Sequence, residues 1–472
     1  MATLPRKATA DLSMPSGKSP SVRAHEHFLE PKPLRQAHKE ANRRERLIKT
    51  TRTLSIHLSF FGTGMYYALF GPTVQDLAVS LDADLFRVLF LLAARGIGGF
   101  VGALFGGVFL KPVNPQVLFV IFDFFLAMAC IGLSYFDTLF QYVFIFAIGG
   151  IALGALNIVG VLWMSAMWRE NSGFLLQTLS FMHCMGCVLG PVVGEPFLTH
   201  RSVIEAPSAT PSYRLTYLSQ LEDKDFIYVT YAYWVVGIYL FAVVLLLLAV
   251  FFVDPRHENL GMMETRCNPV KLSPIIAVLV AYLAVYVAME ILYSQLIASL
   301  ALLLGHNKTT AAYLTSLFWA TFTTVRGVCI LWVQQHGSLT VLLICNGLLV
   351  LTACLNSGLG YQTRVMWVGT SLVGACLAPV LPSTLLLLHD QSGVSSARFA
   401  GVLFVVGASS AISPLCVGAV MERNPMLFYH GFLGLAFISL LLVVGANVLI
   451  HRSEAVIGGY ISLPMEERRR SY

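Results

Sequence analysis

Apolar residues gather into long segments along the chain, while polar residues fall mainly between these segments and at the two ends. A helix needs about 20 mainly apolar residues to cross the hydrocarbon core of a bilayer, which is ~30 Å thick. The pattern therefore predicts an all-α polytopic membrane protein. By this criterion the sequence predicts twelve transmembrane helices, over residues 54–73, 86–110, 115–134, 139–168, 174–198, 227–253, 272–304, 310–333, 338–356, 365–388, 397–421 and 427–450.

Composition supports this interpretation. Of the 472 residues, 56% are hydrophobic and only 12% are charged, whereas soluble proteins carry roughly 25% charged residues. So few charged side chains cannot cover a water-exposed surface, but they suffice if most of the outer surface faces lipid. The polar parts contain no phosphate-binding loop, nucleophile elbow or dinucleotide fingerprint, and an enzyme is therefore not expected.

Basic residues in short loops set the orientation of a membrane protein, because they stay on the cytoplasmic side. The net charge of +6 is concentrated in the tail 1–52, whose basic run leads directly into the first apolar segment. We therefore expect no cleaved signal peptide, no nucleic-acid partner and a cytoplasmic N-terminus. An even number of helices then places the C-terminus on the same side. The sequon that begins at Asn307 falls in an external loop in this topology, which makes Asn307 a candidate N-glycosylation site.

Two sequence correspondences suggest that the chain is a duplicated six-helix unit. Ala94-Arg95-Gly96-Ile97 in the second segment matches Val325-Arg326-Gly327-Val328 in the eighth, and Gly190-Pro191 in the fifth matches Ser413-Pro414 in the eleventh. Parallel six-helix halves are the arrangement of major facilitator transporters. The predicted parts are a basic cytoplasmic tail 1–52, a bundle 53–253, a central cytoplasmic loop 254–271, a bundle 272–450 and a cytoplasmic tail 451–472.

Several motifs that follow one another in order make the match to a family specific. The motifs are residues 60–64 (FFGTG), 71–78 (GPTVQDLA), Arg95-Gly96, residues 102–114 and 154–156 (GAL), Trp168, Gln177, Tyr286-Val287, Glu290, residues 318–322 (FWATF) and Arg326-Gly327. Together, over residues 54–450, they resemble the sodium-dependent glucose transporter-like branch of the major facilitator superfamily.

The resemblance implies a sugar transporter that works by alternating access around a central cavity. It implies no cofactor, with Na⁺ or H⁺ as a coupling ion, and it points to the plasma membrane. The expected partners are the sugar and the lipid bilayer, and no obligate protein partner is evident. The chain departs from the family pattern at three positions. It has Lys111 where family members tend to carry Asp, and it has Asn157 and Val161 where the family pattern has Asp and Asn, respectively. Loss of an intramembrane carboxylate at Asn157 makes facilitated diffusion a second option beside symport.

Four charged residues lie well inside predicted transmembrane helices, away from the helix ends: Arg95, Asp123, Glu290 and Arg326. A charge at a helix centre costs about 2.5–3.5 kcal/mol on insertion scales, so none of these side chains should face lipid. Each can serve in an ion pair or helix clamp, or in transport and coupling. Glu290 is the strongest candidate for substrate binding, because Tyr286 lies one turn before it and Tyr293 three residues after it.

An aromatic ring beside a carboxylate suits a pyranose, which has apolar faces and polar edges. Amides suit sugars as well, because each amide both donates and accepts hydrogen bonds. We therefore add further candidates for the substrate site. They are Gln75 at the external end of the first helix, with Asn157, Gln177 and Trp319 deeper in the membrane. The alternative role for these side chains is to hold helices together.

His183, Cys184 and Cys187 superficially resemble a metal site in a transmembrane helix. Zinc needs about four ligands in tetrahedral geometry, and no second Cys/His pair stands ready. The neighbouring Gly186 and Gly190 indicate a closely packed helix interface instead, and no bound metal is expected. Glycines in the segment 86–110 are expected to give it a smooth face for movement between the halves.

The leading hypothesis is a secondary transporter for glucose or a related monosaccharide, either a cation symporter or a facilitative uniporter. A second hypothesis keeps the fold and changes the solute to an organic anion, which Arg95 and Arg326 would favour if they face the cavity. A third is a receptor or scaffold that transports nothing. The short loops and tails argue against this third hypothesis, because little protein is left to contact a soluble partner.

Overall fold

The computed structural model describes residues 32–110, 112–168, 172–198, 228–255, 274–392 and 396–462, and every regular element in these ranges is a helix. The chain forms two compact units, Met1–Arg52 and Thr53–Tyr472, and the predicted transmembrane helices belong to the second. Most of the predicted central loop 254–271, residues 1–31 and 463–472 of the predicted tails, and Lys111 lie outside the described residues. The predicted domain limits therefore stay a prediction.

All twelve predicted segments coincide with helices. The helices before residue 256, called the N-terminal helices below, are α2 (Lys32–Ser80), α3 (Leu85–Val88), α4 (Phe90–Phe109), α5 (Pro115–Gly132), α6 (Leu139–Trp168), α7 (Ser172–Gly194) and α9 (Tyr228–Val253), with single 3₁₀ turns η1 (Leu133–Tyr135) and η3 (Glu195–Phe197). The C-terminal helices are α10 (Pro274–Leu303), α11 (Lys308–His336), α12 (Ser338–Leu359), α13 (Thr363–Leu377), α14 (Val380–Ser392), α15 (Ser396–Met421) and α16 (Met426–Ser462).

The segment predicted as one helix over 365–388 is divided into α13 and α14. Proline has no backbone N–H and clashes with the preceding turn, so a helix tends to end just before it. Here α13 ends at Leu377, the N–H of Ala378 still bonds the carbonyl of Gly374 at 3.2 Å, and α14 begins after Pro379. The break therefore follows from a residue that the hydropathy pattern does not register.

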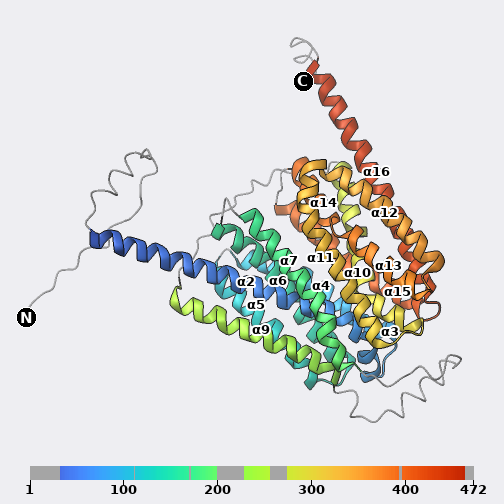
Figure 1. The fold of residues 1–472 in the computed structure, drawn as a ribbon, viewed down its shortest axis with the longest axis horizontal. Coiled ribbons are helices and arrows are strands. Elements are labelled where there is room, and N and C mark those ends of the chain that lie inside the picture. The colour runs from blue at the N-terminus through green and yellow to red at the C-terminus, as the bar shows by residue number, and fades with distance from the viewer. Residues whose placement is uncertain are drawn as a thin grey trace, which may run out of the picture. The chain divides into compact units, whose positions relative to one another are not determined.

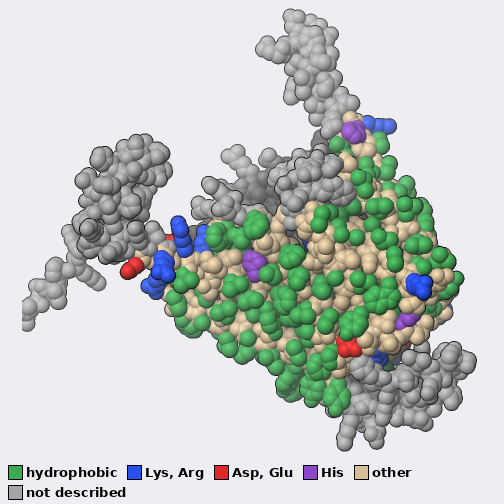
Figure 2. Space-filling model, viewed as in Figure 1, with side chains coloured by type: hydrophobic (Ala, Val, Ile, Leu, Met, Phe, Trp, Pro, Cys, Tyr) green, Lys and Arg blue, Asp and Glu red, His purple; other side chains and the backbone are tan. Residues whose placement is uncertain are grey.

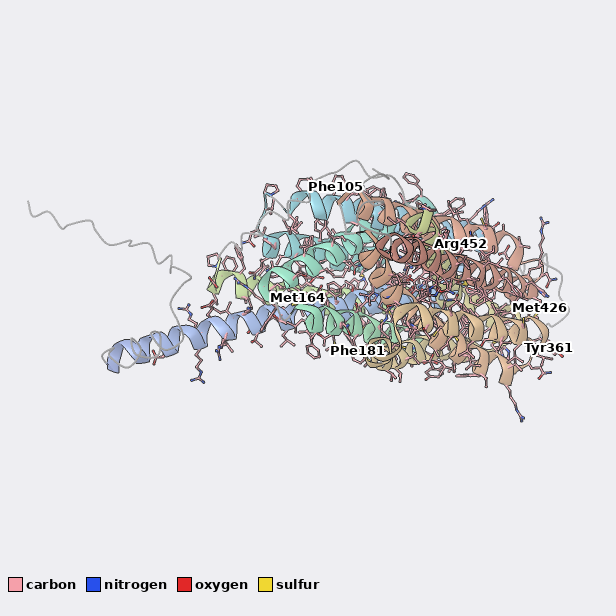
Figure 3. The ribbon with its side chains drawn as sticks, turned by 90° about the horizontal axis from the view of Figure 1, so that it is seen from above. Phe105, Met164, Phe181, Tyr361, Met426 and Arg452 are labelled. Carbon is pink, nitrogen blue, oxygen red and sulfur yellow. The ribbon has the colours of Figure 1, made fainter. Side chains whose placement is uncertain are left out.

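The outer faces of the helices are apolar. Among the described residues, nine helices are long and apolar enough to cross a membrane. Phe105 of α4 is 47% exposed and Phe181 of α7 is 40% exposed, and both lie on the outside of the bundle (Figure 3). Hydrophobic side chains also cover most of the face shown in Figure 2. Such a surface suits lipid, where the helices satisfy their backbone groups internally.

The glycines of α4 pack mainly against α6. A Cβ atom on Gly102 would collide with the carbonyl of Ile151, and one on Gly154 would collide with the carbonyl of Gly99. Small residues allow two helix backbones to approach this closely. We expected the glycine face to serve movement between the halves, but most of it holds two N-terminal helices together. Gly96 is different, because it lies against Ser410 of α15.

The N-terminal and C-terminal helices lie side by side as two groups (Figure 1). They meet where α4 packs against α15 and α7 packs against α11. In the first pair, Gly418 lies against Leu89 and Gly407 lies against Phe100. Gly71 of α2 also approaches the backbone of α10, since a Cβ atom there would lie 3.2 Å from the carbonyl oxygen of Ser294. The contact surface between the groups is therefore built around glycines.

Polar contacts join the two groups at the end of the bundle where α2 finishes, called the Asp76 end below. The Lys308 ammonium group at the start of α11 forms an ion pair with the buried Asp76 carboxylate. The Thr309 hydroxyl donates a hydrogen bond to Glu195 Oε1 at 2.8 Å. The N–H of Leu85 donates to Glu422 Oε1 at 2.7 Å. Each of these contacts ties an N-terminal element to a C-terminal one.

Candidate substrate site

Glu290 lies in the middle of α10, half-buried among residues that are mostly buried. The Tyr286 side chain, one turn earlier, is completely buried, and its hydroxyl lies near the Glu290 carboxyl group. Tyr293 takes part in a different network. Its hydroxyl lies 3.2 Å from the Thr370 hydroxyl, and its ring stacks on Phe318. Of the two tyrosines predicted to flank Glu290, Tyr286 has its hydroxyl near the carboxyl group, whereas the hydroxyl of Tyr293 contacts Thr370.

Arg326 of α11 reaches across to the N-terminal helices. Its Nε donates to the carbonyl of Ala378 at 3.4 Å, and its Nη1 donates to Cys184 Sγ of α7 at 3.5 Å. Its guanidinium carbon lies 4.6 Å from the centre of the Phe322 ring, as in a cation–π contact. The charge of Glu290 also acts on Arg326. Arg326 is thus placed between the two groups of helices.

Arg95 of α4 is buried and is held by Tyr67 of α2. Its Nη1 donates to the Tyr67 carbonyl at 3.0 Å, and its guanidinium carbon lies 4.5 Å from the centre of the Tyr67 ring. The same ring meets Trp319 of α11 edge-on and lies beside His183 of α7, with ring centres 5.9 Å apart in both cases. Tyr67 therefore connects both groups of helices around Arg95.

These side chains form one electrostatic unit. Arg95, Glu290 and Arg326 all lie close enough to the buried Cys187 thiol for their charges to influence it, so they belong to one region of the protein. We call this unit the central cluster. Its members come from α2, α4, α7, α10 and α11, and they are Tyr67, Arg95, His183, Cys184, Cys187, Tyr286, Glu290, Trp319 and Arg326.

Several polar atoms of the central cluster are buried with no hydrogen-bond partner among the described residues. They are the Tyr286 hydroxyl, Trp319 Nε1 and Arg326 Nη2. A buried donor left unsatisfied costs about 1–3 kcal/mol, and more when it belongs to a charged group. Such a cost is tolerated where another molecule satisfies the donors for part of the time. The three atoms therefore favour a polar ligand in this region.

The structure brings five of the predicted residues together in the central cluster, namely Arg95, Tyr286, Glu290, Trp319 and Arg326. No described contact joins the amide candidates to these five residues. Gln75 is half-buried near the end of α2, and Gln177 is exposed on α7. Asn157 is exposed on α6, and its amide donates to the carbonyl of Leu153 in the same helix at 2.9 Å. The roles predicted for these residues stay predictions.

Asp123 of α5 is completely buried within the N-terminal helices. Its Oδ1 accepts a hydrogen bond from the Ser59 hydroxyl of α2 at 2.9 Å, and its Oδ2 has no partner among the described residues. This contact clamps α2 to α5. A clamp is one of the two roles that the sequence left open for Asp123.

Tyr67, His183 and Cys184 were not among the predicted site residues. The close packing predicted for their part of α7 is present, because Gly186 lies against Phe61 and Gly190 against Met65. That packing brings His183 and Cys184 beside α2 and α11, and the His183 ring lies 3.1 Å from the Thr63 hydroxyl. The signal available in the sequence is the group of His183, Cys184 and Cys187 itself, which predicts close helix packing but does not specify the contact with α11.

Asn307 is exposed immediately before α11. Its Oδ1 accepts a hydrogen bond from the N–H of Thr310 at 2.7 Å, which caps the helix. The sequon nitrogen is the other atom of the amide, so the cap leaves it available. Glycosylation at Asn307 stays a prediction.

Comparison with known proteins shows which transporters this chain is similar to. No family model matches the chain. Human sodium-dependent glucose transporter 1 is 25% identical over 389 residues, which cover 78% of this chain and 73% of the human protein. Major facilitator superfamily domain-containing protein 4A of Xenopus tropicalis is 24% identical over 441 residues, which cover 79% of this chain and 86% of that protein.

Solved structures agree on the fold. The xylose transporter XylE from E. coli, in an inward-open conformation, matches with a TM-score of 0.64 and 13% identity, over 84% of this chain and 95% of that one. The nucleoside transporter NupG matches with a TM-score of 0.62 and 12% identity, over 85% of this chain and 99% of that one. The chain therefore has the major facilitator fold of multi-pass, non-enzymatic secondary transporters, and it is similar to the sodium-dependent glucose transporter-like branch.

Proposed function

We propose that this transporter carries a monosaccharide by alternating access and binds it at the central cluster. The observation that carries the proposal is the set of buried, unsatisfied donors on Tyr286, Trp319 and Arg326, next to the Glu290 carboxyl group. The cluster lies between the two groups of helices, where a rocking movement would expose it to each side in turn. The names of the glucose and xylose transporters that the chain resembles support a sugar as the solute.

In this proposal Glu290 accepts hydrogen bonds from sugar hydroxyls, which are strengthened by its negative charge. The Tyr286 hydroxyl binds a sugar oxygen on the same side as Glu290, and the Trp319 and Arg326 donors bind further hydroxyl oxygens of the ring. Trp319 and Tyr67, whose rings meet edge-on, lie beside an apolar face of the sugar. Gln75, Asn157 and Gln177 would contact the sugar along its path into the cluster, since no described hydrogen bond joins them to the cluster.

We propose further that the protein lies in the plasma membrane with both chain termini in the cytoplasm. The Asp76 end is then the external end. The positive-inside rule supports this orientation, because the basic N-terminal tail precedes α2 and Asp76 lies where α2 finishes. The ion pair of Asp76 with Lys308 would then close the external side. Its opening, together with that of the neighbouring contacts, would admit the sugar.

Coupling to Na⁺ or H⁺ depends on a carboxylate that changes its partners during transport. Glu290 is the candidate, because it lies at the site and near Arg326. Asn157 cannot serve in this way, because an amide carries no charge. Facilitated diffusion is the alternative. It would be established by a rate of sugar uptake that is the same with and without gradients of Na⁺ and H⁺.

The test is uptake of radiolabelled hexoses and pentoses into proteoliposomes, with and without gradients of Na⁺ and H⁺. We expect uptake above that of empty liposomes, and we expect Glu290→Gln to reduce it by tenfold or more, about 1.4 kcal/mol of lost binding. Asp137→Asn makes the same chemical change at an exposed position away from the cluster and should leave uptake unchanged. Uptake equal to that of empty liposomes for every sugar would overturn the proposal.

A further inference from the structure

The central cluster has an excess of positive charge. Among the described residues it holds two guanidinium groups, Arg95 and Arg326, and one carboxyl group, Glu290. Two positive charges and one negative charge leave one positive charge when Glu290 is ionised. His183 can only add to this excess, since its ring is neutral or positive.

The other buried carboxylates engage different groups. Asp123 accepts from Ser59 and acts on Cys130 and Tyr239, within the N-terminal helices. Asp76 forms its ion pair with Lys308 at the Asp76 end. Arg95 is held by neutral groups, the carbonyl and ring of Tyr67 and the ring of Phe70. A cation–π contact or a carbonyl stabilises a guanidinium group but leaves its charge in place.

Arg326 shows where a compensating anion would bind. Its Nε and Nη1 already donate to Ala378 and Cys184, whereas its Nη2 is buried with no partner among the described residues. Cys184 Sγ is a weak acceptor and lies 3.5 Å away. A carboxylate can replace that contact and satisfy Nη2 as well, because guanidinium and carboxylate match in a two-pronged geometry. A neutral hydroxyl would satisfy one donor and leave the charge uncompensated.

We infer that the preferred substrate is a monosaccharide that carries a carboxylate, such as a hexuronate, and that Arg326 binds this carboxylate. The inference rests on the proposed function and narrows its substrate class. Glu290 and Tyr286 then bind the hydroxyls of the ring, and Trp319 donates its Nε1 proton to a further oxygen. Arg95 contributes positive potential from the side of the N-terminal helices.

The test compares uptake of radiolabelled glucuronate and glucose into proteoliposomes that hold the full chain. A charge-assisted pair that neutral glucose cannot form predicts a preference for glucuronate of about 10- to 100-fold in kcat/KM. Arg326→Gln should lower the ratio of the two uptakes by a similar factor, and Arg326→Lys, which keeps the charge, should retain part of it. Arg364→Gln removes an exposed arginine and should leave the ratio unchanged. A ratio measured on the same vesicles does not depend on how much protein is folded.

The outcomes separate this inference from the proposed function. Glucose uptake equal to or above glucuronate uptake in the natural protein overturns the inference and leaves the proposed function standing. A preference for glucuronate that persists in Arg326→Gln overturns the role of Arg326. Uptake of neither solute, nor of any other sugar, overturns both.

Discussion

The ion pair between Asp76 and Lys308 should stabilise the conformation that is closed at the Asp76 end relative to the one that is open there. It joins α2 to α11 across the two groups of helices, together with the contacts of Glu195 and Glu422. A state that is open at the Asp76 end must break it. Asp76→Asn would leave the Lys308 ammonium group without its counter-charge only in the closed state, because in the open state water solvates both groups. The substitution should therefore favour opening at this end.

The exposure of the two side chains sets the magnitude. Asp76 is 3% exposed and Lys308 is 19% exposed. Removing one partner from a fully buried pair costs about 3–5 kcal/mol, whereas an exposed pair contributes about 0–1 kcal/mol. Because Lys308 retains some contact with solvent, we expect a cost of about 1–3 kcal/mol to the closed state. That corresponds to an increase of about 5- to 150-fold in the ratio of open to closed molecules.

Distances between spin labels on Ser80 and Tyr361 would measure this ratio, since each residue lies at the Asp76 end of a different group. We expect Asp76→Asn to raise the population with the longer distance. Asp82→Asn is the matched control, because Asp82 is exposed and its φ of 47° is one that asparagine tolerates. The double variant Asp76→Asn with Lys308→Met should have a ratio of open to closed molecules closer to that of the natural protein than Asp76→Asn alone has. Unchanged distances in Asp76→Asn would refute the reasoning.

Three further predictions concern stability and modification. Asp123→Asn keeps an oxygen that can accept from Ser59 and should retain thermal stability in detergent, whereas Asp123→Leu loses this hydrogen bond and should lower stability by about 1–3 kcal/mol. Gly102→Val should prevent formation of a monodisperse protein, as judged by size-exclusion chromatography, because its Cβ would collide with the α6 backbone. Gly107→Val should be tolerated, since the nearest atom to its Cβ, in a side chain, lies 4.0 Å away. Asn307→Asp keeps the helix cap but removes the glycan acceptor, so a glycosylated protein should become smaller on gels with no loss of stability.

The sequence predicted the helices well because crossing a bilayer demands long apolar segments. It failed where backbone chemistry competes with hydropathy, as at Pro379, where one predicted helix became α13 and α14. The sequence also predicted the glycine face of α4 but not which neighbour it contacts. Gly102 meets α6 and Gly96 meets α15, and this choice depends on the packing of the whole bundle.

The candidate site could be predicted in part. Glu290 and Tyr286 lie one turn apart on a single helix, so helical spacing alone places them together. The contact of Arg326 with Cys184 joins α11 to α7, and these two residues are 142 positions apart along the chain. No periodicity within a helix specifies such a contact. The amides of Asn157 and Gln177 were chosen by residue type and family match, and both side chains are exposed.

If Asn307 is glycosylated, Thr309 meets two requirements with one hydroxyl group. The oligosaccharide-transferring machinery needs a hydroxyl at this position of the sequon, and the folded protein uses the same hydroxyl to contact Glu195 across the two groups of helices. Serine would meet both requirements and alanine neither. Natural variation at this position should therefore be limited to threonine and serine, even in lineages that have lost Asn307.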